Sequence, residues 1–104
     1  MPEPMVGHMV YFQLNDSTPA NQQKLVDACK KFLTNHRGQV FFGVGLRGEA
    51  FVRPVNDHDW DVGLHIIFQT KADHDRYQGS ERHVRFVAEN KANWKKVRVF
   101  DSVI

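Results

Sequence analysis

The chain has 104 residues, of which 41% are apolar and 25% are charged, and its formal net charge at pH 7 is +2. A chain of this length supports one hydrophobic core, and this composition excludes a disordered or fibrous protein. The small net charge gives no reason to expect a nucleic-acid partner, although residues 91–98 are locally basic.

Targeting and redox features favour the cytoplasm. The first eight residues lack the cationic start and long apolar run of a secretory signal. No other stretch approaches the roughly 18 apolar residues of a membrane span, so no membrane partner is expected. The single cysteine, Cys29, lies on the apolar side of a predicted helix, which indicates a packed and unreactive thiol. We therefore expect one cytoplasmic domain over residues 1–104.

The first half of the chain predicts a strand, a helix and a second strand. Residues 7–14 alternate in a strand pattern with large apolar groups on both faces. A helix is predicted from Pro19, which suits a first helical turn, towards Gly38, which is placed to end it. Residues 39–47 then alternate as a second strand.

The second half predicts a strand, two helical segments and a final strand. Residues 48–60 are rich in turn residues and predict a long connection that includes a strand extension. Residues 61–68 predict the third strand, a short helix then reaches Tyr77, and Ser80 is the N-cap candidate of a second helical segment. Residues 95–103 predict the fourth strand. The apolar side of the second helical segment is predicted to contain Val84, Val87 and Ala88.

This order of elements predicts an α+β fold of the split βαβ type, β-α-β-β-α-β, with a four-stranded antiparallel sheet and helices on one face. The opposite face would carry Met9, Tyr11, Phe41 and Ile67. Such a patch is larger than monomers usually expose. We therefore expect a second copy of the chain to cover it, which predicts a homodimer through the sheet face.

Two motifs suggest ligands but have simpler explanations. Residues 43–48 match the glycine pattern of dinucleotide-binding loops, yet no helix is predicted after them to bind a pyrophosphate. Asp57, Asp59 and Asp61 alternate as ligands of a hard cation could, but the later glycine and glutamate of a calcium loop are missing. We predict no cofactor and no metal site, and leave open whether these three aspartates bind a cation.

Two of the six histidines stand out by position. His8 lies among the inward residues of the first strand, and His83 lies in the first turn of a predicted helix. The amino end of a helix disfavours a cation, so His83 should stay neutral and able to accept a proton. A role in capping the helix is the alternative for His83.

Three segments of the chain, residues 8–12, 61–68 and 77–87, together resemble the stress-responsive A/B barrel (Dabb) family. The resemblance extends over nearly the whole chain, and the order of elements agrees with it. In that family two ferredoxin-like subunits join their sheets into a dimeric α/β barrel. The resemblance therefore implies this fold, a homodimer and a link to stress response.

Members of this family typically carry an aromatic residue followed by a His-Pro-x-His element. This chain has Tyr77 and then Ser80-Glu81-Arg82-His83, so the second histidine is kept while Ser80 and Glu81 replace the first histidine and the proline. In a related polyketide cyclase, a tyrosine and a histidine in this region act in an aldol-type ring closure. The resemblance implies Tyr77 and His83 as catalytic residues, and His8, Tyr77 and His83 as ligand-binding residues.

Two functions follow from these observations. The first is a homodimer that binds a small apolar or aromatic molecule in a pocket between sheet and helices, without assured catalysis. The second is a cofactor-free enzyme of the polyketide cyclase or monooxygenase type, in which His83 removes a proton beside a carbonyl and the Tyr77 hydroxyl stabilises the enolate. Haem binding is a third alternative, and it requires an axial histidine that faces the cavity.

Overall fold

The computed structural model describes residues 3–104, which form one four-stranded sheet and three α-helices. The strands are β1 (Val6–Leu14), β2 (Gln39–Leu46), β3 (Val62–Phe68) and β4 (Trp94–Val103). The helices are α1 (Pro19–Phe32), α2 (Lys71–Gln78) and α3 (Glu81–Asn90), and a short 3-10 turn (Lys91–Asn93) follows α3. This is the predicted ferredoxin-like β-α-β-β-α-β order, with the second helical region divided at Gly79 and Ser80.

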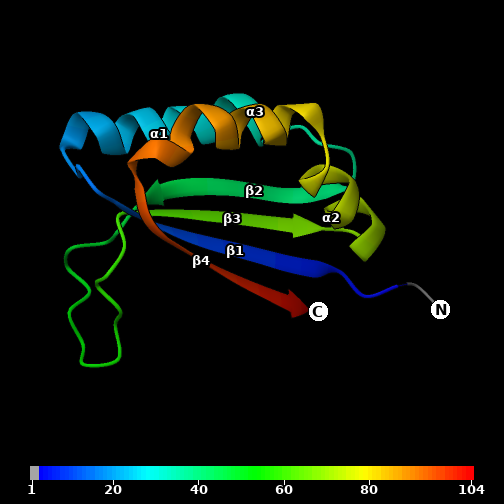
Figure 1. Ribbon diagram of the computed structural model, residues 1–104. Coiled ribbons are helices and arrows are strands. Elements are labelled where there is room, and N and C mark those ends of the chain that lie inside the picture. Colours follow the sequence, from blue (N-terminus) through cyan, green and yellow to red (C-terminus); the bar gives the residue numbers. More distant parts are fainter. Residues whose placement is uncertain (1–2) are drawn as a thin grey trace.

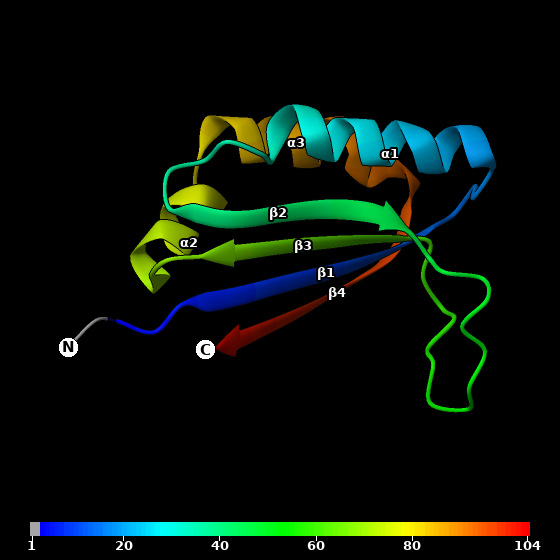
Figure 2. The same cartoon turned by 180° about the vertical axis from the view of Figure 1, so that it is seen from behind.

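The sheet is antiparallel throughout and has the strand order β2-β3-β1-β4. Helices α1 and α3 lie on the same side of it, while α2 lies at one end (Figure 1; Figure 2). In both views the connection between β2 and β3 extends away from the sheet on the side opposite the helices. The predicted fold class is therefore confirmed.

The core lies between the sheet and the helices, as the strand pattern predicted. Alternate residues of β1 and β3 point toward the helices and are buried there, because successive side chains of a strand point to opposite faces. Leu25, Cys29 and Phe32 of α1 cover them, together with Phe86 of α3. The buried apolar strand residues are Val6, Val10, Phe12, Leu14, Val62, Leu64, Ile66 and Phe68.

Helix α1 begins where the sequence predicted and ends six residues before Gly38, so Gly38 is not its end. The Thr18 side chain accepts a hydrogen bond from the Asn21 N–H at 3.1 Å and caps the start. At the other end a His36 ring nitrogen lies 2.8 Å from the Phe32 carbonyl, and the Gln39 amide donates to the Leu33 carbonyl at 2.6 Å. Side chains thus satisfy the final carbonyl groups, and no glycine is needed there.

The buried side of α3 differs from the prediction. Val84 is 58% exposed and Ala88 is also exposed, whereas Phe86 is only 2% exposed. The buried stripe runs through His83, Phe86 and Val87, which follows the i, i+3, i+4 spacing of a helix face. The prediction placed the stripe one residue out of phase and missed Phe86.

The connection between β2 and β3 contains no strand extension, contrary to the prediction. Residues 48–60 form local turns, in which the Phe51 N–H donates to the Gly48 carbonyl at 3.2 Å and the Asn56 N–H to the Arg53 carbonyl at 2.9 Å. These turns use backbone N–H and carbonyl groups that hydrogen bonds to a neighbouring strand would need. A bond of 2.7 Å between Arg98 and Asp57 ties the connection to β4.

The helices leave one face of the sheet uncovered, and we call it the outer sheet face. Its large side chains include Tyr11, Phe41 and Phe100, and the last two are 54% and 53% exposed. Trp60 packs against Tyr11 with ring centroids 4.9 Å apart. A Cβ atom added to Gly45 on this face would meet no heavy atom within 4 Å. The outer sheet face is therefore apolar and open.

Candidate functional site

A cavity of about 170 Å³ lies between the sheet and helices α2 and α3. Its walls are mostly apolar and come from β1, β3, β4, α3 and the end of α1. A polar group of His8, Tyr77, Gln78 and His83 completes the lining. The apolar walls are Val10, Phe12, Leu33, Leu64, Phe86, Val87, Trp94, Val97 and Val99.

The structure brings all three residues of the predicted site to this cavity. His8 comes from β1, Tyr77 from α2 and His83 from α3. The ring centroids of Tyr77 and His83 are 4.9 Å apart, and those of His8 and Tyr77 are 5.9 Å apart. Tyr77 therefore neighbours both imidazoles, and all three rings line the cavity.

The imidazole of His83 is not the cap of α3, because the Ser80 side chain fills that role. Ser80 is the N-cap of α3, and its hydroxyl accepts the backbone N–H of His83 at 3.2 Å. Burial lowers the pKa of His83, and the nearby His8, His36 and His74 lower it further. The predicted neutral form is favoured, mainly through burial of the ring.

Tyr77 is a protonated phenol in this site. The side chain is 2% exposed, and burial raises its pKa above the usual value, so the hydroxyl keeps its proton at neutral pH. A phenol in this state donates a hydrogen bond to a carbonyl or hydroxyl oxygen. Tyr77 thus supplies a donor beside the neutral imidazole of His83, which supplies an acceptor.

Asp101 of β4 is a further polar residue of this region, and the sequence analysis missed it. It lies opposite His8 in the β1–β4 register, and its Oδ1 is 2.5 Å from His8 Nδ1. Burial lowers the pKa of His8, while the hydrogen bond to Asp101 opposes that shift. The alternation that placed Val97 and Val99 toward the helices also places Asp101 there, so the signal was present in β4.

Other candidates from the sequence do not form sites in the described residues. Cys29 is fully buried, and burial raises the pKa of its thiol to about 12, in agreement with an unreactive thiol. Asp57 pairs with Arg98, whereas a carboxylate oxygen of Asp61 accepts the Leu14 N–H at 2.8 Å. Within residues 3–104, the group of side chains spaced for a metal ion is His8, His74 and Asp101.

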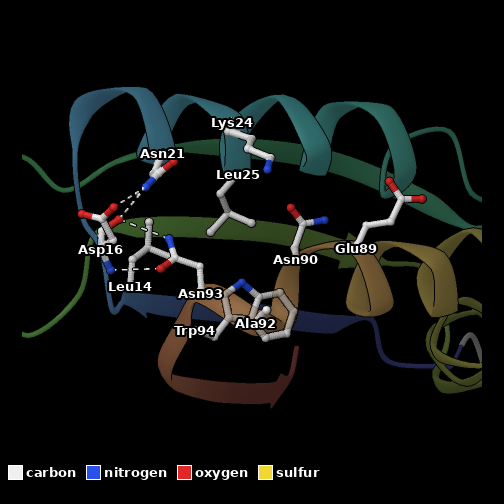
Figure 3. A pocket seen from close by; sticks show the side chains of 10 residues that line it. All are labelled: Leu14, Asp16, Asn21, Lys24, Leu25, Glu89, Asn90, Ala92, Asn93 and Trp94. Atoms are coloured by element: carbon white, nitrogen blue, oxygen red, sulfur yellow. Dashed lines mark hydrogen bonds between the residues drawn. The ribbon is translucent and has the colours of Figure 1, made fainter.

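A second cavity, of about 280 Å³, lies between α1 and the end of α3 (Figure 3). At one end Asp16 is hydrogen-bonded to both Asn21 and Asn93. Trp94 lines both this cavity and the first one. In residues 3–104, its indole Nε1 is the one buried side-chain nitrogen or oxygen without a hydrogen-bond partner. None of the predicted site residues lies here.

The buried histidines predict a loss of stability in mild acid. The folded-state pKa of His83 lies below its ordinary value of 6.5, so the unfolded chain takes up this proton first as the pH falls. The free energy of unfolding should therefore fall as the pH drops below 6.5. Urea unfolding at a series of pH values below 6.5 should show a smaller fall in His83→Gln. The matched control, His58→Gln on the exposed connection, should keep the wild-type slope, and an unchanged slope in His83→Gln would contradict the assignment.

The fold and the cavity define an α+β domain of the ferredoxin-like class with a ligand-sized space between sheet and helices. The family model of the Stress responsive A/B Barrel Domain matches residues 6–104. The chain belongs to this family. Comparison with curated proteins gave no match. Among residues 3–104, no helix has the length and apolar run that crossing a bilayer requires.

Solved structures with the same fold cover almost the entire chain. A Dabb family protein with a ferredoxin-like fold from Mesorhizobium loti has a TM-score of 0.80 and 26% identity, with 98% of both chains covered. A dimeric ferredoxin-like protein of unknown function from Thermobifida fusca has a TM-score of 0.80 and 14% identity, with 98% of this chain and 92% of that chain covered. A hydroxynitrile lyase from Passiflora edulis has a TM-score of 0.79 and 15% identity, with coverage of 99% and 95%.

Proposed function

We propose that the protein is a homodimer that binds a small aromatic molecule in the cavity lined by His8, Tyr77 and His83. One observation carries this proposal: an apolar cavity with a phenol donor and neutral imidazole acceptors gathered on one side. Small-molecule sites commonly combine apolar walls with a few convergent polar groups.

The volume of the cavity indicates the size of the ligand. At about 170 Å³ it is smaller than the roughly 300 Å³ at which drug-sized pockets begin. An apolar cavity of about 150 Å³ in another protein holds one benzene molecule. A single six-membered ring with one oxygen substituent therefore matches the space, and the oxygen would meet Tyr77 and His83. Phenols and aryl ketones have this chemistry.

The cavity has a route to solvent along β4. Val97 and Val99 line it and are 39% and 51% exposed, because the helices do not fully cover this edge strand. A ligand with a short tail could lay that tail over these two side chains while its ring occupied the cavity. The exposed valines thus favour apolar substituents over charged ones.

A homodimer is supported by the outer sheet face. Aromatic residues and methionine are enriched at the centres of protein interfaces, and this face carries Met9, Tyr11, Phe41 and Phe100. Gly45 leaves space for close approach of a second sheet. The solved T. fusca relative is described as dimeric, which agrees with this arrangement.

Ligand binding is tested by NMR titration of the 15N-labelled protein with phenol and with acetophenone. We expect saturable shifts of the amide signals of cavity residues such as Phe12, Phe86 and Val97, because these residues line the cavity. Val87→Phe should abolish the shifts, since the added ring fills the cavity. Val84→Phe, on the exposed side of the same helix, is the matched control and should bind like wild type.

Two outcomes would overturn the binding proposal. One is the absence of saturable shifts with both compounds in the wild-type protein. The other is equal binding by wild type and Val87→Phe, which would place the ligand elsewhere. Folding of each variant is checked by its amide spectrum without ligand.

A second function, cofactor-free proton transfer, is favoured by the contact between Tyr77 and His83. Their ring centroids are 4.9 Å apart, and the neutral imidazole can remove a proton beside a carbonyl while the phenol donates to the developing enolate oxygen. Such a pair would serve a polyketide cyclase or monooxygenase type of reaction. The replacement of the first histidine and the proline by Ser80 and Glu81 leaves this pair in place.

Proton transfer is measured with acetophenone in D2O, where removal of a methyl proton and return of a deuteron from the solvent replaces hydrogen with deuterium. If the pair is catalytic, wild type accelerates this exchange, and His83→Gln lowers the rate constant by about 100- to 10,000-fold. Tyr77→Phe keeps the ring and should lower the rate while acetophenone still binds. Exchange no faster than in buffer, with binding intact, would leave a binding protein without this activity.

A further inference from the structure

The two histidines His8 and His74 are oriented alike by the groups around them. His8 Nδ1 lies 2.5 Å from Asp101 Oδ1, and His74 Nδ1 lies 3.0 Å from Asp75 Oδ1. A carboxylate only accepts hydrogen bonds, so each Nδ1 carries a proton and donates it. In the neutral form of each ring, the Nε2 atom is then the one that holds a free lone pair.

Both free lone pairs face the side-chain amide of Gln78. The Gln78 amide nitrogen lies 3.4 Å from His8 Nε2 and 3.5 Å from His74 Nε2. These distances exceed the usual 2.7–3.2 Å of a hydrogen bond between such groups. The ring centroids of the two histidines are 4.9 Å apart, so the rings are neighbours on adjacent elements. The side chains of His8, His74 and Gln78 thus converge, but the contacts between them are too long for good hydrogen bonds.

Two of the separations match the geometry of a tetrahedral metal site, and His8 and His74 each offer a ligand atom within 4.8 Å of the other. Two ligands bound at ~2.1 Å with a tetrahedral angle lie ~3.4 Å apart, which is the spacing between the Gln78 amide and each Nε2 atom. Half a turn of the Gln78 amide replaces its nitrogen with its oxygen, which is a metal ligand. Asp101 and Asp75 then accept hydrogen bonds from the Nδ1 atoms of the two imidazoles, as carboxylates do around metal-bound histidines.

We propose that His8 Nε2, His74 Nε2 and Gln78 Oε1 bind a Zn2+ ion, with a water molecule as the fourth ligand. A groove of about 390 Å³, lined by residues that include His74, Asp75 and Asp101, gives the ion a path from solvent. The His74 ring is partly exposed, while His8 is almost fully buried. The site thus forms the wall between this groove and the aromatic cavity.

This proposal does not depend on the binding of an aromatic ligand. The ion would occupy the side of His8 that faces α2, where its ligand His74 lies outside the aromatic cavity, whereas His8 and Gln78 line that cavity as well. Zinc binding and acetophenone binding are measured separately, the latter in the presence of EDTA. A failure to bind zinc and a failure to bind acetophenone can therefore be told apart.

The test is calorimetric titration of EDTA-treated, dialysed full-length protein with ZnCl2. We expect one Zn2+ ion per chain, and at least a tenfold weaker affinity in His74→Ala because a direct ligand is lost. Gln78→Leu should also weaken binding. His58→Ala, which removes an exposed histidine far along the chain, is the matched control and should bind like wild type.

Absence of zinc binding in the wild type would overturn the proposal. Equal affinity in wild type and His74→Ala would overturn it as well, because the ion would then sit elsewhere. Equal or tighter binding in Gln78→Leu would overturn the assignment of the amide oxygen. If a variant fails to fold, anomalous diffraction at the zinc edge locates the ion in wild-type crystals, and a peak away from His8 and His74 overturns the site.

Discussion

Phe86→Ala should lower the free energy of unfolding by about 3–5 kcal/mol, the usual cost of removing a buried aromatic ring. Phe86 is 2% exposed and packs against Phe12 and Trp94, with ring centroids 6.2 and 5.7 Å away. Its removal joins new empty space to the existing cavity, which the fixed strands of the sheet cannot close. Urea unfolding at fixed protein concentration measures the change.

The matched control for this prediction is Val84→Ala on the same helix. Val84 is 58% exposed, and a change at such a surface position usually alters stability by no more than about 0.5 kcal/mol. A loss of less than about 1 kcal/mol in Phe86→Ala would show that α3 contributes little to the core. Equal losses in the two variants would contradict the observed buried side of α3.

Ile67→Glu should convert the proposed homodimer into a folded monomer. Ile67 lies on the outer sheet face in β3, a central strand, and pairs in register with Gly7 and Phe41. A carboxylate buried there without a partner costs several kcal/mol, and a two-fold interface contains the change twice. Light scattering should give a mass near the 12.1 kDa of one chain for the variant, and twice that for wild type.

The control for the interface is Val84→Glu, which adds the same charge on the helix side of the domain. It should leave the dimer intact, because α3 lies on the side of the sheet away from the outer sheet face. A monomeric wild-type protein would contradict the dimer. A dimeric Ile67→Glu with wild-type affinity would place the interface on another surface.

Much of the fold could be predicted because its signals are local. The alternation in residues 62–68 and the turn signals around Pro19 and Ser80 fixed strands and helix starts. The end of α1 could not be predicted in this way, since His36 and Gln39 satisfy its carbonyl groups from beyond the helix. The strand extension predicted within residues 48–60 was wrong because local turns compete for the same backbone groups.

The candidate site could be predicted only in part. The resemblance of Tyr77 and His83 to a family element, and the inward position of His8, named three of its residues, which the structure places together. Asp101 is 93 residues from His8 in the chain, and their contact depends on the β1–β4 register. His74 and Gln78 lie on α2, a helix with few apolar residues, so no stripe indicated which side faces His8. The buried side of α3 was predicted wrongly because Val84 is apolar, like a core residue, although it is exposed.

The contact between Asp101 and His8 depends on how β4 is aligned with β1. Asp101 faces His8 only in the observed register, and the irregularity between Gln13 and Leu14 lies at the far end of that pairing. Sliding β4 by one residue would turn Val97, Val99 and Asp101 to the opposite face, since successive strand side chains alternate. One added or deleted residue within β4 would therefore remove the cavity wall and the carboxylate together. Length changes are best tolerated in the connection at residues 48–60, whereas the spacing from Trp94 to Asp101 is fixed by the site.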